Sequence, residues 1–365
     1  MKVLSLFDGV SCARLALERA GVEVTEYFAS EIDKYAIKVT QTNRPKTFQI
    51  GDVKEFSFES RNPIDLLIGG SPCQDLSIAK KDRKGLEGSR SSLFYEYVRH
   101  LNEVKPRYFI LENVASMPKE AKATITKELF GIEPVMINAS LVSAQNRKRL
   151  FWVGKLVGDT YEQVHIEQPE DMQIYLKDIL ESDVDEKYNI NITLKTGLKG
   201  LCQLNEKAKT LTSTMHKGYG NDGCSMVRIG QIGKGGQRDR IYSPEGKSVS
   251  LSALGGGRGA KTGLYKIEQE PDGTALDYYN DNIVPNNKAK VLGTNPQSTT
   301  AVAGQLVKTD SVIRKLTPIE CERLQGMPDN WTNPTGDISN TQRYKMCGNA
   351  FNVDVVAHII KQLNL

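Results

Sequence analysis

The sequence lacks several features that mark common classes of protein. It has no apolar run of about 18 residues, the length a membrane-spanning helix needs. Its six cysteines are scattered over 365 residues, with no CxxC pair and no Cys/His spacing typical of a metal site. Asp8 interrupts the apolar start of the chain, so a signal peptide is not expected. We therefore expect a cytoplasmic protein without a membrane span, a disulfide framework or a bound metal.

The dinucleotide fingerprint G-x-G-x-x-G is also missing, so a nicotinamide cofactor is not favoured. The first half of the chain instead alternates short apolar runs with helical patterns. Strands are expected at 3–7, 23–30, 64–68, 108–111 and 133–138, and helices at 12–20, 34–43, 93–104 and 121–129. This alternation predicts an α/β fold built on a doubly wound parallel sheet. Near the end, helices are expected at 318–325, with Thr317 as N-cap, and at 353–363.

The formal net charge is only +4, but it is distributed unevenly. Residues 159–186 hold ten Asp or Glu and one Lys, whereas residues 187–266 hold fourteen Lys or Arg and four acids. From about residue 187, helical periodicity gives way to short β-like runs among glycines, which predicts a small, mostly β unit. A basic segment of this length suits a phosphate-backbone partner, and a solvated surface is the alternative.

A cysteine follows one of the expected strands at the point where α/β sheets place their ligand sites. The apolar run 64–68 leads into Gly69-Gly70-Ser71-Pro72-Cys73-Gln74. In open α/β sheets ligands bind at the carboxyl ends of the strands, and Pro72 would hold the following thiol rigidly. Cys73 is therefore a candidate nucleophile. A lone cysteine is more often a buried structural thiol, and only the remaining motifs favour catalysis.

Three other segments predict a nucleoside-containing cofactor at the same edge of the sheet. Phe7 and Gly9 lie between the first strand and the first helix, where a glycine lets a ligand approach free backbone N–H groups. Glu31 ends the second strand, where an acid can hold ribose hydroxyls. Asp52, with Val53 beside it, offers a further acidic contact. Each signal alone is more often structural, and their order along the chain carries the interpretation.

A carboxylate and two arginines complete the candidate chemistry. Glu112 ends another expected strand and so lies on the same rim as Cys73. Arg147 and Arg149 are two residues apart and would share one face if the segment is extended. A surface basic cluster is the alternative interpretation of these arginines.

Taken together, the motifs resemble the DNA (cytosine-5) methyltransferases of bacteria and phages. The resemblance covers nearly the whole chain except about 170 to 310. It rests on six motifs in order: Phe7-x-Gly9, Gly69 to Gln74, Glu112-Asn113-Val114, Gln145-x-Arg147-x-Arg149, Arg314 to Gly326, and Gly348-Asn349-Ala350. Ser11 stands where the family commonly has a second glycine, and Ala350 where it commonly has serine.

The resemblance implies a fold with two domains. A doubly wound, Rossmann-like methyltransferase domain that binds S-adenosylmethionine would comprise 1–170 plus 340–365. A smaller, mostly β target-recognition domain would comprise 171–339, with Arg238, Arg240 and Arg258 as candidate readers of guanine. The loop 75–90, which carries four Lys or Arg before its last residue, would close as a lid over DNA.

The resemblance also implies roles for the catalytic residues. Cys73 would add to C6 of a cytosine flipped out of duplex DNA, which makes C5 able to accept a methyl group. Glu112 would hold the ring nitrogen and the amino group, and Arg149 would contact the O2 side with Arg147 in support. The S-adenosylmethionine contacts would be Phe7, Gly9, Glu31, Asp52, Val53, Pro72, Leu93, Asn349 and Ala350.

Double-stranded DNA is the expected partner and a monomer the expected state. A tRNA cytosine-5 methyltransferase can share these motifs, although the long recognition region favours duplex DNA. A DNA-binding protein with an inactive site is the alternative from a different class. The intact set Cys73, Glu112, Arg147 and Arg149 argues against it.

Overall fold

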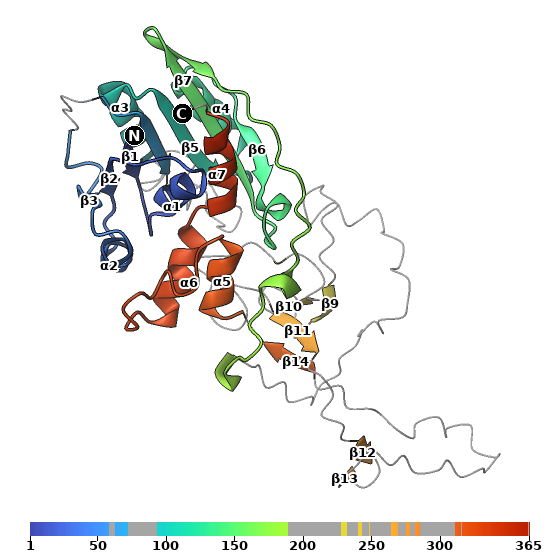
Figure 1. Ribbon diagram of the computed structural model, residues 1–365. Helices are drawn as coiled ribbons and strands as arrows, with labels where there is room; N and C mark the ends of the chain where they lie inside the picture. Colours follow the sequence, from blue (N-terminus) through green and yellow to red (C-terminus); the bar gives the residue numbers. More distant parts are fainter. Residues whose placement is uncertain are drawn as a thin grey trace, which may run out of the picture.

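The computed structural model describes most of the first and last thirds of the chain and isolated strands between them (Figure 1). The described residues are 1–57, 63–71, 93–188, 228–231, 240–242, 248, 264–268, 275–277, 282–284, 311–314, 316–363 and 365. Both termini lie in the part of the fold that contains the large sheet (Figure 1).

The large sheet has the strand order β3-β2-β1-β4-β5-β7-β6, with β8 paired to β7. Its strands are β1 (Lys2–Leu6), β2 (Glu26–Ser30), β3 (Phe48–Gln49), β4 (Leu66–Gly70), β5 (Tyr108–Val114), β6 (Val135–Asn138), β7 (Lys148–Val157) and β8 (Thr160–Gln163). Strands β1 to β5 pair in parallel, whereas β7 runs antiparallel to β5, β6 and β8. The strand order reverses between β1 and β4, so the ligand crevice of a doubly wound sheet is expected at their carboxyl ends.

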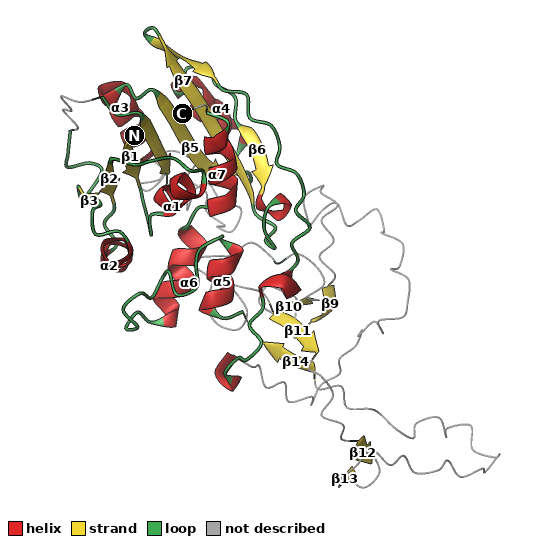
Figure 2. Cartoon of the chain, in the orientation of Figure 1, coloured by secondary structure: helices red, strands yellow, loops and turns green. Residues whose placement is uncertain are grey.

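Helices cover both faces of this sheet (Figure 2). They are α1 (Cys12–Arg19), α2 (Lys34–Asn43), α3 (Leu93–Val104), α4 (Lys119–Glu128) and α7 (Val353–Lys361). Residues from α1, α2 and α7 form one buried cluster, and residues from α3 and α4 form the other. Successive strand residues alternate between the two clusters, as Leu66 and Leu67 do, because neighbouring side chains of a strand point to opposite faces.

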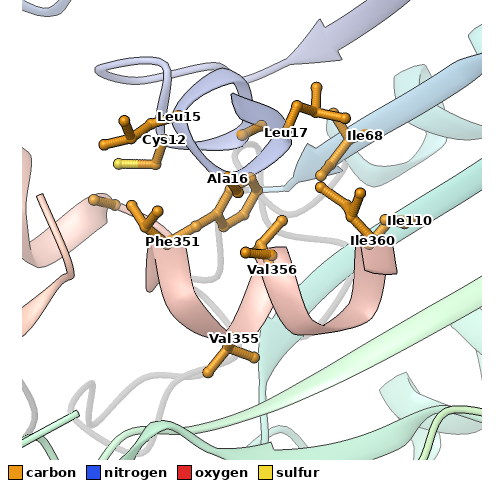
Figure 3. Close-up of a cluster of buried hydrophobic side chains, with 14 of the residues drawn as sticks. Cys12, Leu15, Ala16, Leu17, Ile68, Ile110, Phe351, Val355, Val356 and Ile360 are labelled. Carbon is orange, nitrogen blue, oxygen red and sulfur yellow. The ribbon is translucent and has the colours of Figure 1, made fainter. Parts of the chain in front are cut away.

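The last helix returns to pack against the first one, beside the middle of the sheet. Figure 3 shows Val356 and Ile360 of α7 close to α1 and to the strand residues Ile68 and Ile110. Apolar side chains recur on α7 with helical spacing, and burial of that face holds the helix against the sheet. Phe351, just before α7, reaches the same cluster and so brings the preceding loop to the sheet.

The remaining described elements include a second, smaller sheet. The strands β9 (Arg228–Gln231), β10 (Arg240–Tyr242), β11 (Leu264–Glu268) and β14 (Ser311–Arg314) form a second sheet, and β12 (Ala275–Asp277) pairs with β13 (Asn282–Val284). The 3-10 helices η2 (Ala139–Leu141), η3 (Leu176–Ile179) and η4 (Glu186–Tyr188) and the helices α5 (Pro318–Leu324) and α6 (Asn340–Asn349) complete the described elements. Thr317 caps α5 as expected. The boundaries proposed for two domains stay a prediction.

The expected α/β fold is confirmed, with differences at element ends and in the second half of the sheet. Strand β1 ends at Leu6 rather than Phe7, because Phe7 takes a left-handed backbone, φ 58°. The spacing of apolar residues, every second residue for strands and about every 3.6 residues for helices, did not indicate β3, β7, β8 or α6. Strand β7 is buried on both faces over much of its length, so it shows no alternation of apolar and polar residues. No helix in the described ranges is long and apolar enough to cross a membrane.

Candidate active site

The loop after β1 has an unusual backbone that places its N–H groups at the edge of the sheet. Phe7, Gly9 and Ser11 all have positive φ, at 58°, 60° and 57°. A Cβ at Gly9 would have no other atom within 4 Å, so the space where a side chain would lie is open. Ser11 holds the left-handed conformation that a second glycine would adopt more readily. Its hydroxyl bonds to Asp8 and lies 3.0 Å from Thr40 Oγ1, which offsets part of that strain. The serine therefore preserves the backbone turn.

Glu31 connects the loops after β1 and β2. One carboxylate oxygen accepts from Gly9 N at 2.8 Å, and the other accepts from the backbone N–H groups of Ile32 and Asp33, each at 2.8 Å. Three backbone donors fix the carboxylate, while the residue stays only partly buried. Ile32 beside it is 72% exposed, so an apolar side chain lies next to this carboxylate at the surface. Sequence reasoning missed Ile32, because its exposure depends on the tertiary fold.

The loop after β3 is also ordered by its own residues. Asp52 Oδ1 accepts from Lys54 N at 3.0 Å, an Asx-type turn that sets the carboxylate at the loop tip. Val53 is buried, and its side chain joins the cluster beneath α3. The three loops after β1, β2 and β3 thus present Gly9, Glu31 and Asp52 along one edge of the sheet.

Asp8 is a buried carboxyl group beneath the first of these loops. It accepts hydrogen bonds from the hydroxyls of Tyr27, at 2.6 Å, and Ser11. Burial raises the pKa of the Asp8 carboxyl from 3.8 to about 6, and the nearby Glu31 carboxylate adds to the shift. Between pH about 4 and 6 the folded protein holds a proton that the unfolded chain releases. The stability contribution of the neutral form is therefore lost as pH rises from about 4 to 6.

An Asp8→Asn variant should lack this pH dependence. The pKa shift on Asp8 corresponds to about 3 kcal/mol of unfolding free energy. Relative to wild type, the variant should therefore gain stability between pH ~4 and pH ~8 by an amount of that order. Chemical unfolding at a series of pH values measures the difference. If the difference in unfolding free energy between the two proteins stays constant with pH, the pKa of Asp8 is not raised in the folded protein.

Glu112 of β5 and Arg149 of β7 form an ion pair in the other half of the sheet, past the point between β1 and β4 where the strand order reverses. Arg149 Nε lies 2.8 Å from Glu112 Oε1, and the two side chains are 13% and 17% exposed for the acid and the arginine. The antiparallel register places Arg149 opposite Val114, two residues beyond Glu112 on the same face. Two predicted site residues are therefore in direct contact in a partly buried position.

Arg147 makes different contacts from Arg149. Its Nη2 donates to the carbonyl oxygens of Gly348, at 3.1 Å, and Ala350, at 3.0 Å. Its side chain is buried, so it anchors the loop at the end of α6. Ala350 is buried and Asn349 is exposed within that loop. The two arginines thus hold different neighbours, although they are two residues apart.

Two glycines at the end of β4 permit close packing around Glu112. A Cβ on Gly70 would lie 2.7 Å from the Phe351 ring and 3.1 Å from Glu112 Oε2. A Cβ on Gly69 would lie 2.9 Å from the Leu6 carbonyl oxygen. Such distances leave no room for a side chain, which explains the Gly-Gly pair before Ser71. The end of β4, the Glu112 carboxylate and Phe351 therefore converge on one point.

Asn113 attaches the segment after β4 to β5. Its Nδ2 donates to Ser71 Oγ at 3.1 Å, and its Oδ1 accepts from Val114 N at 2.8 Å. Ser71 is the last described residue before Pro72 and Cys73. Those two residues and the predicted lid, 75–90, lie outside the described residues. Leu93 begins α3 and is partly buried.

If Asn113 orients the chain leading to Cys73, Asn113→Ala should lower kcat about tenfold with little change in cofactor affinity. Ser71→Ala removes the other half of the same hydrogen bond. The double variant should therefore lose no more than Asn113→Ala alone, since that change already removes the shared hydrogen bond. Steady-state kinetics at saturating cofactor measure this cycle. Strictly additive losses would mean that the hydrogen bond does not orient the segment.

The described cysteines are unsuited to catalysis. Cys12, Cys321 and Cys347 are free and buried. Burial raises the pKa of each of these thiols well above its ordinary value, so none forms a thiolate readily. Within the described part of the chain, no cluster of His, Cys, Asp and Glu could hold a metal ion.

Ser248 of the basic segment pairs with the chain just before the two arginines. Ser248 N donates to Ala144 O at 2.7 Å, and Asn146 N donates to Ser248 O at 2.9 Å. This parallel bridge lies immediately before Arg147 and Arg149 in the chain. Arg240 begins β10, but its side chain and the whole of Arg238 and Arg258 lie outside what is described.

Comparisons with known proteins show what this chain is similar to. The family model described as C-5 cytosine-specific DNA methylase matches residues 1–364. The chain is 28% identical to the Type II methyltransferase M.HhaI of Haemophilus parahaemolyticus over 369 residues, which cover 98% of this chain and 93% of the relative. It is 27% identical to the Orphan methyltransferase M.SPRI of Bacillus phage SPR, covering 100% and 97% of the two chains. The solved structure of the Entamoeba histolytica methyltransferase EhMeth shares the fold, with a TM-score of 0.62, 17% identity and coverage of 100% and 97%.

Proposed function

Because the chain belongs to the C-5 cytosine-specific DNA methylase family, we propose that it methylates C5 of a cytosine flipped out of duplex DNA, through a covalent bond from Cys73. That the protein is a cytosine-5 DNA methyltransferase follows from the family itself. The covalent route, the flipped base and the individual residue roles are the proposal. The contact that supports it is the partly buried Glu112–Arg149 pair beside the end of β4. That strand ends at Gly70, three residues before Cys73 in the sequence.

Cys73 acts first in the proposed reaction. Its thiolate adds to C6 of cytosine, and the electrons of the C5–C6 double bond become available at C5. C5 would then take the methyl group of S-adenosylmethionine as the methyl–sulfur bond breaks, with S-adenosylhomocysteine as the leaving group. A base then removes the C5 proton, the C5–C6 double bond re-forms, and the C6–S bond breaks to release the thiolate. The cytosine must leave the helical stack for this attack, because C6 is inaccessible inside a duplex.

Glu112 and Arg149 hold the cytosine ring in this scheme. The Glu112 carboxylate faces the ring nitrogen and the amino group. The ring nitrogen is protonated as the thiolate adds, and the carboxylate stabilises this protonated ring in the covalent adduct. Arg149 orients that carboxylate through its ion pair and reaches the O2 side of the base. Arg147 supports both by anchoring the loop of Asn349 and Ala350.

S-adenosylmethionine is the methyl donor that family members use, and the described residues fit it. The open space beside Gly9, in the loop after β1, would let a ligand lie close to the backbone. Glu31 is fixed by three backbone donors with its residue partly exposed, which suits ribose hydroxyls. Asp52 and Val53 would hold the adenine, with exposed Ile32 packing on its face. Phe7, Pro72, Leu93, Asn349 and Ala350 would complete the enclosure.

A methyl-transfer assay tests the proposal. Purified protein is incubated with S-adenosylmethionine labelled in the methyl group and, separately, with unmethylated duplex DNA and unmodified tRNA. Label should enter DNA alone, and modified-base sequencing should place it on C5 of cytosine in one recurring sequence. Label in tRNA alone would favour the RNA enzyme instead, and label in neither would mean an inactive site.

A further inference from the structure

Helix α3 holds the loop that carries Asp52 and Val53 through two adjacent side chains. Arg99 Nη2 donates to the carbonyl oxygens of Val53, at 2.8 Å, and Phe56, at 3.2 Å. His100 Nε2 lies 2.9 Å from the same Val53 oxygen and donates to it in the tautomer protonated at that nitrogen. One backbone carbonyl of the loop is thus bound twice from a rigid helix.

The Arg99 side chain is itself held in place by its own helix. Its Nε donates to Glu96 at 2.8 Å, and its Nη1 donates to Glu103 at 2.8 Å. These acids are three residues before and four residues after it, so both reach the guanidinium along one helix face. Because the two carboxylates bind Nε and Nη1 of the planar guanidinium, the remaining nitrogen, Nη2, is directed at the loop. This is a preorganised contact rather than a mobile surface charge.

His100 adds a packing contact to the same loop. Its side chain is fully buried, and its ring stacks on Phe56 with centroids 4.4 Å apart. Burial lowers the pKa of His100 below its ordinary value, so the ring is neutral at neutral pH. Its Nδ1 lies 3.6 Å from Glu103 Oε2, and Arg99 lies on its other side. The loop 51–57 is therefore fixed by both hydrogen bonds and ring stacking.

We infer that Arg99 and His100 are positioning residues for the adenine end of the cofactor site. This inference rests on the proposed role of Asp52 and Val53. By binding the Val53 carbonyl, Arg99 and His100 of α3 would fix the orientation of Asp52 and Val53. Because Leu93 begins the same helix and is predicted to contact the cofactor, one rigid element would set two walls of the adenine pocket. A loop held in its binding geometry before the ligand arrives binds more tightly, because less ordering is needed.

Binding of S-adenosylhomocysteine, measured calorimetrically, tests this. Arg99→Ala should weaken binding about tenfold, as expected when charge-assisted hydrogen bonds to two loop carbonyls are lost. His100→Phe keeps the ring stacking but removes the donor, and should also weaken binding. His100→Gln retains a donor near the position of Nε2 and should recover most of the affinity. Arg107→Ala is the matched control, because Arg107 is exposed at the opposite end of β5 and its loss should change nothing.

A second ligand separates positioning from general destabilisation. S-inosylhomocysteine has a carbonyl in place of the adenine amino group. It therefore lacks the amino N–H from which Asp52 would accept a hydrogen bond. The Arg99 and His100 variants should lose affinity for the adenosyl compound but little for the inosyl compound. Equal affinity of Arg99→Ala and wild type, or equal losses for both ligands, would overturn the inference. If wild type and every variant fail alike to bind S-adenosylhomocysteine, the proposed function itself is wrong.

Discussion

Replacing Cys73 with alanine is expected to reduce DNA methylation to below about 1% of the wild-type rate, because loss of a covalent nucleophile costs orders of magnitude. Folding and DNA binding should persist, since alanine removes only the sulfur. Methyl transfer at saturating S-adenosylmethionine, together with a DNA-binding titration, measures both properties. Turnover well above that level would remove Cys73 from the chemistry.

A trapping experiment examines the same step directly. Duplex DNA with 5-fluorocytosine at the target should leave a denaturant-stable adduct, because fluorine cannot depart from C5 as a proton does. Peptide mapping should find the adduct on the peptide with Cys73. The buried thiols Cys12, Cys321 and Cys347 are internal controls, since burial raises their pKa and keeps them unreactive. An active enzyme that forms no adduct would contradict the covalent route.

Replacing Glu112 with glutamine should lower kcat by about two to three orders of magnitude while cofactor binding stays unchanged. The substitution keeps the size of the side chain but removes the charge that would stabilise the protonated ring of the covalent adduct. It also leaves Arg149 beside a neutral amide in place of its 2.8 Å ion-pair partner. Single-turnover kinetics on DNA, with cofactor affinity measured separately, isolates the chemical step.

Two further variants sharpen this result. Glu120→Gln removes an equal charge from an exposed position on α4 and should leave kcat unchanged. Arg149→Lys keeps the charge but loses the planar fork that aligns a carboxylate, so it should also lower kcat. A Glu112→Gln enzyme with near wild-type kcat would show that the carboxylate does not stabilise the reacting base.

Much of the candidate site could be predicted from the sequence because its parts are local. Asp52 follows β3, a strand that the sequence patterns did not indicate. Gly9, Glu31 and Glu112, however, each end or follow a predicted strand, and parallel strands bring their carboxyl ends to one edge. That rule alone places these residues on a common rim. The sequence did not indicate β7, because a strand buried on both faces carries no alternating pattern.

The sequence by itself determined the α/β class, the order of the site loops and the family, since each depends on short segments read in order. Only the tertiary structure decided which residues touch. It paired Glu112 with Arg149 through an antiparallel register, and it directed Arg147 to the backbone after α6. It also set Arg99 against Val53, 46 residues earlier in the chain. Such contacts join residues far apart in the sequence, so no local periodicity records them, and they form only when the sheet and its helices pack together.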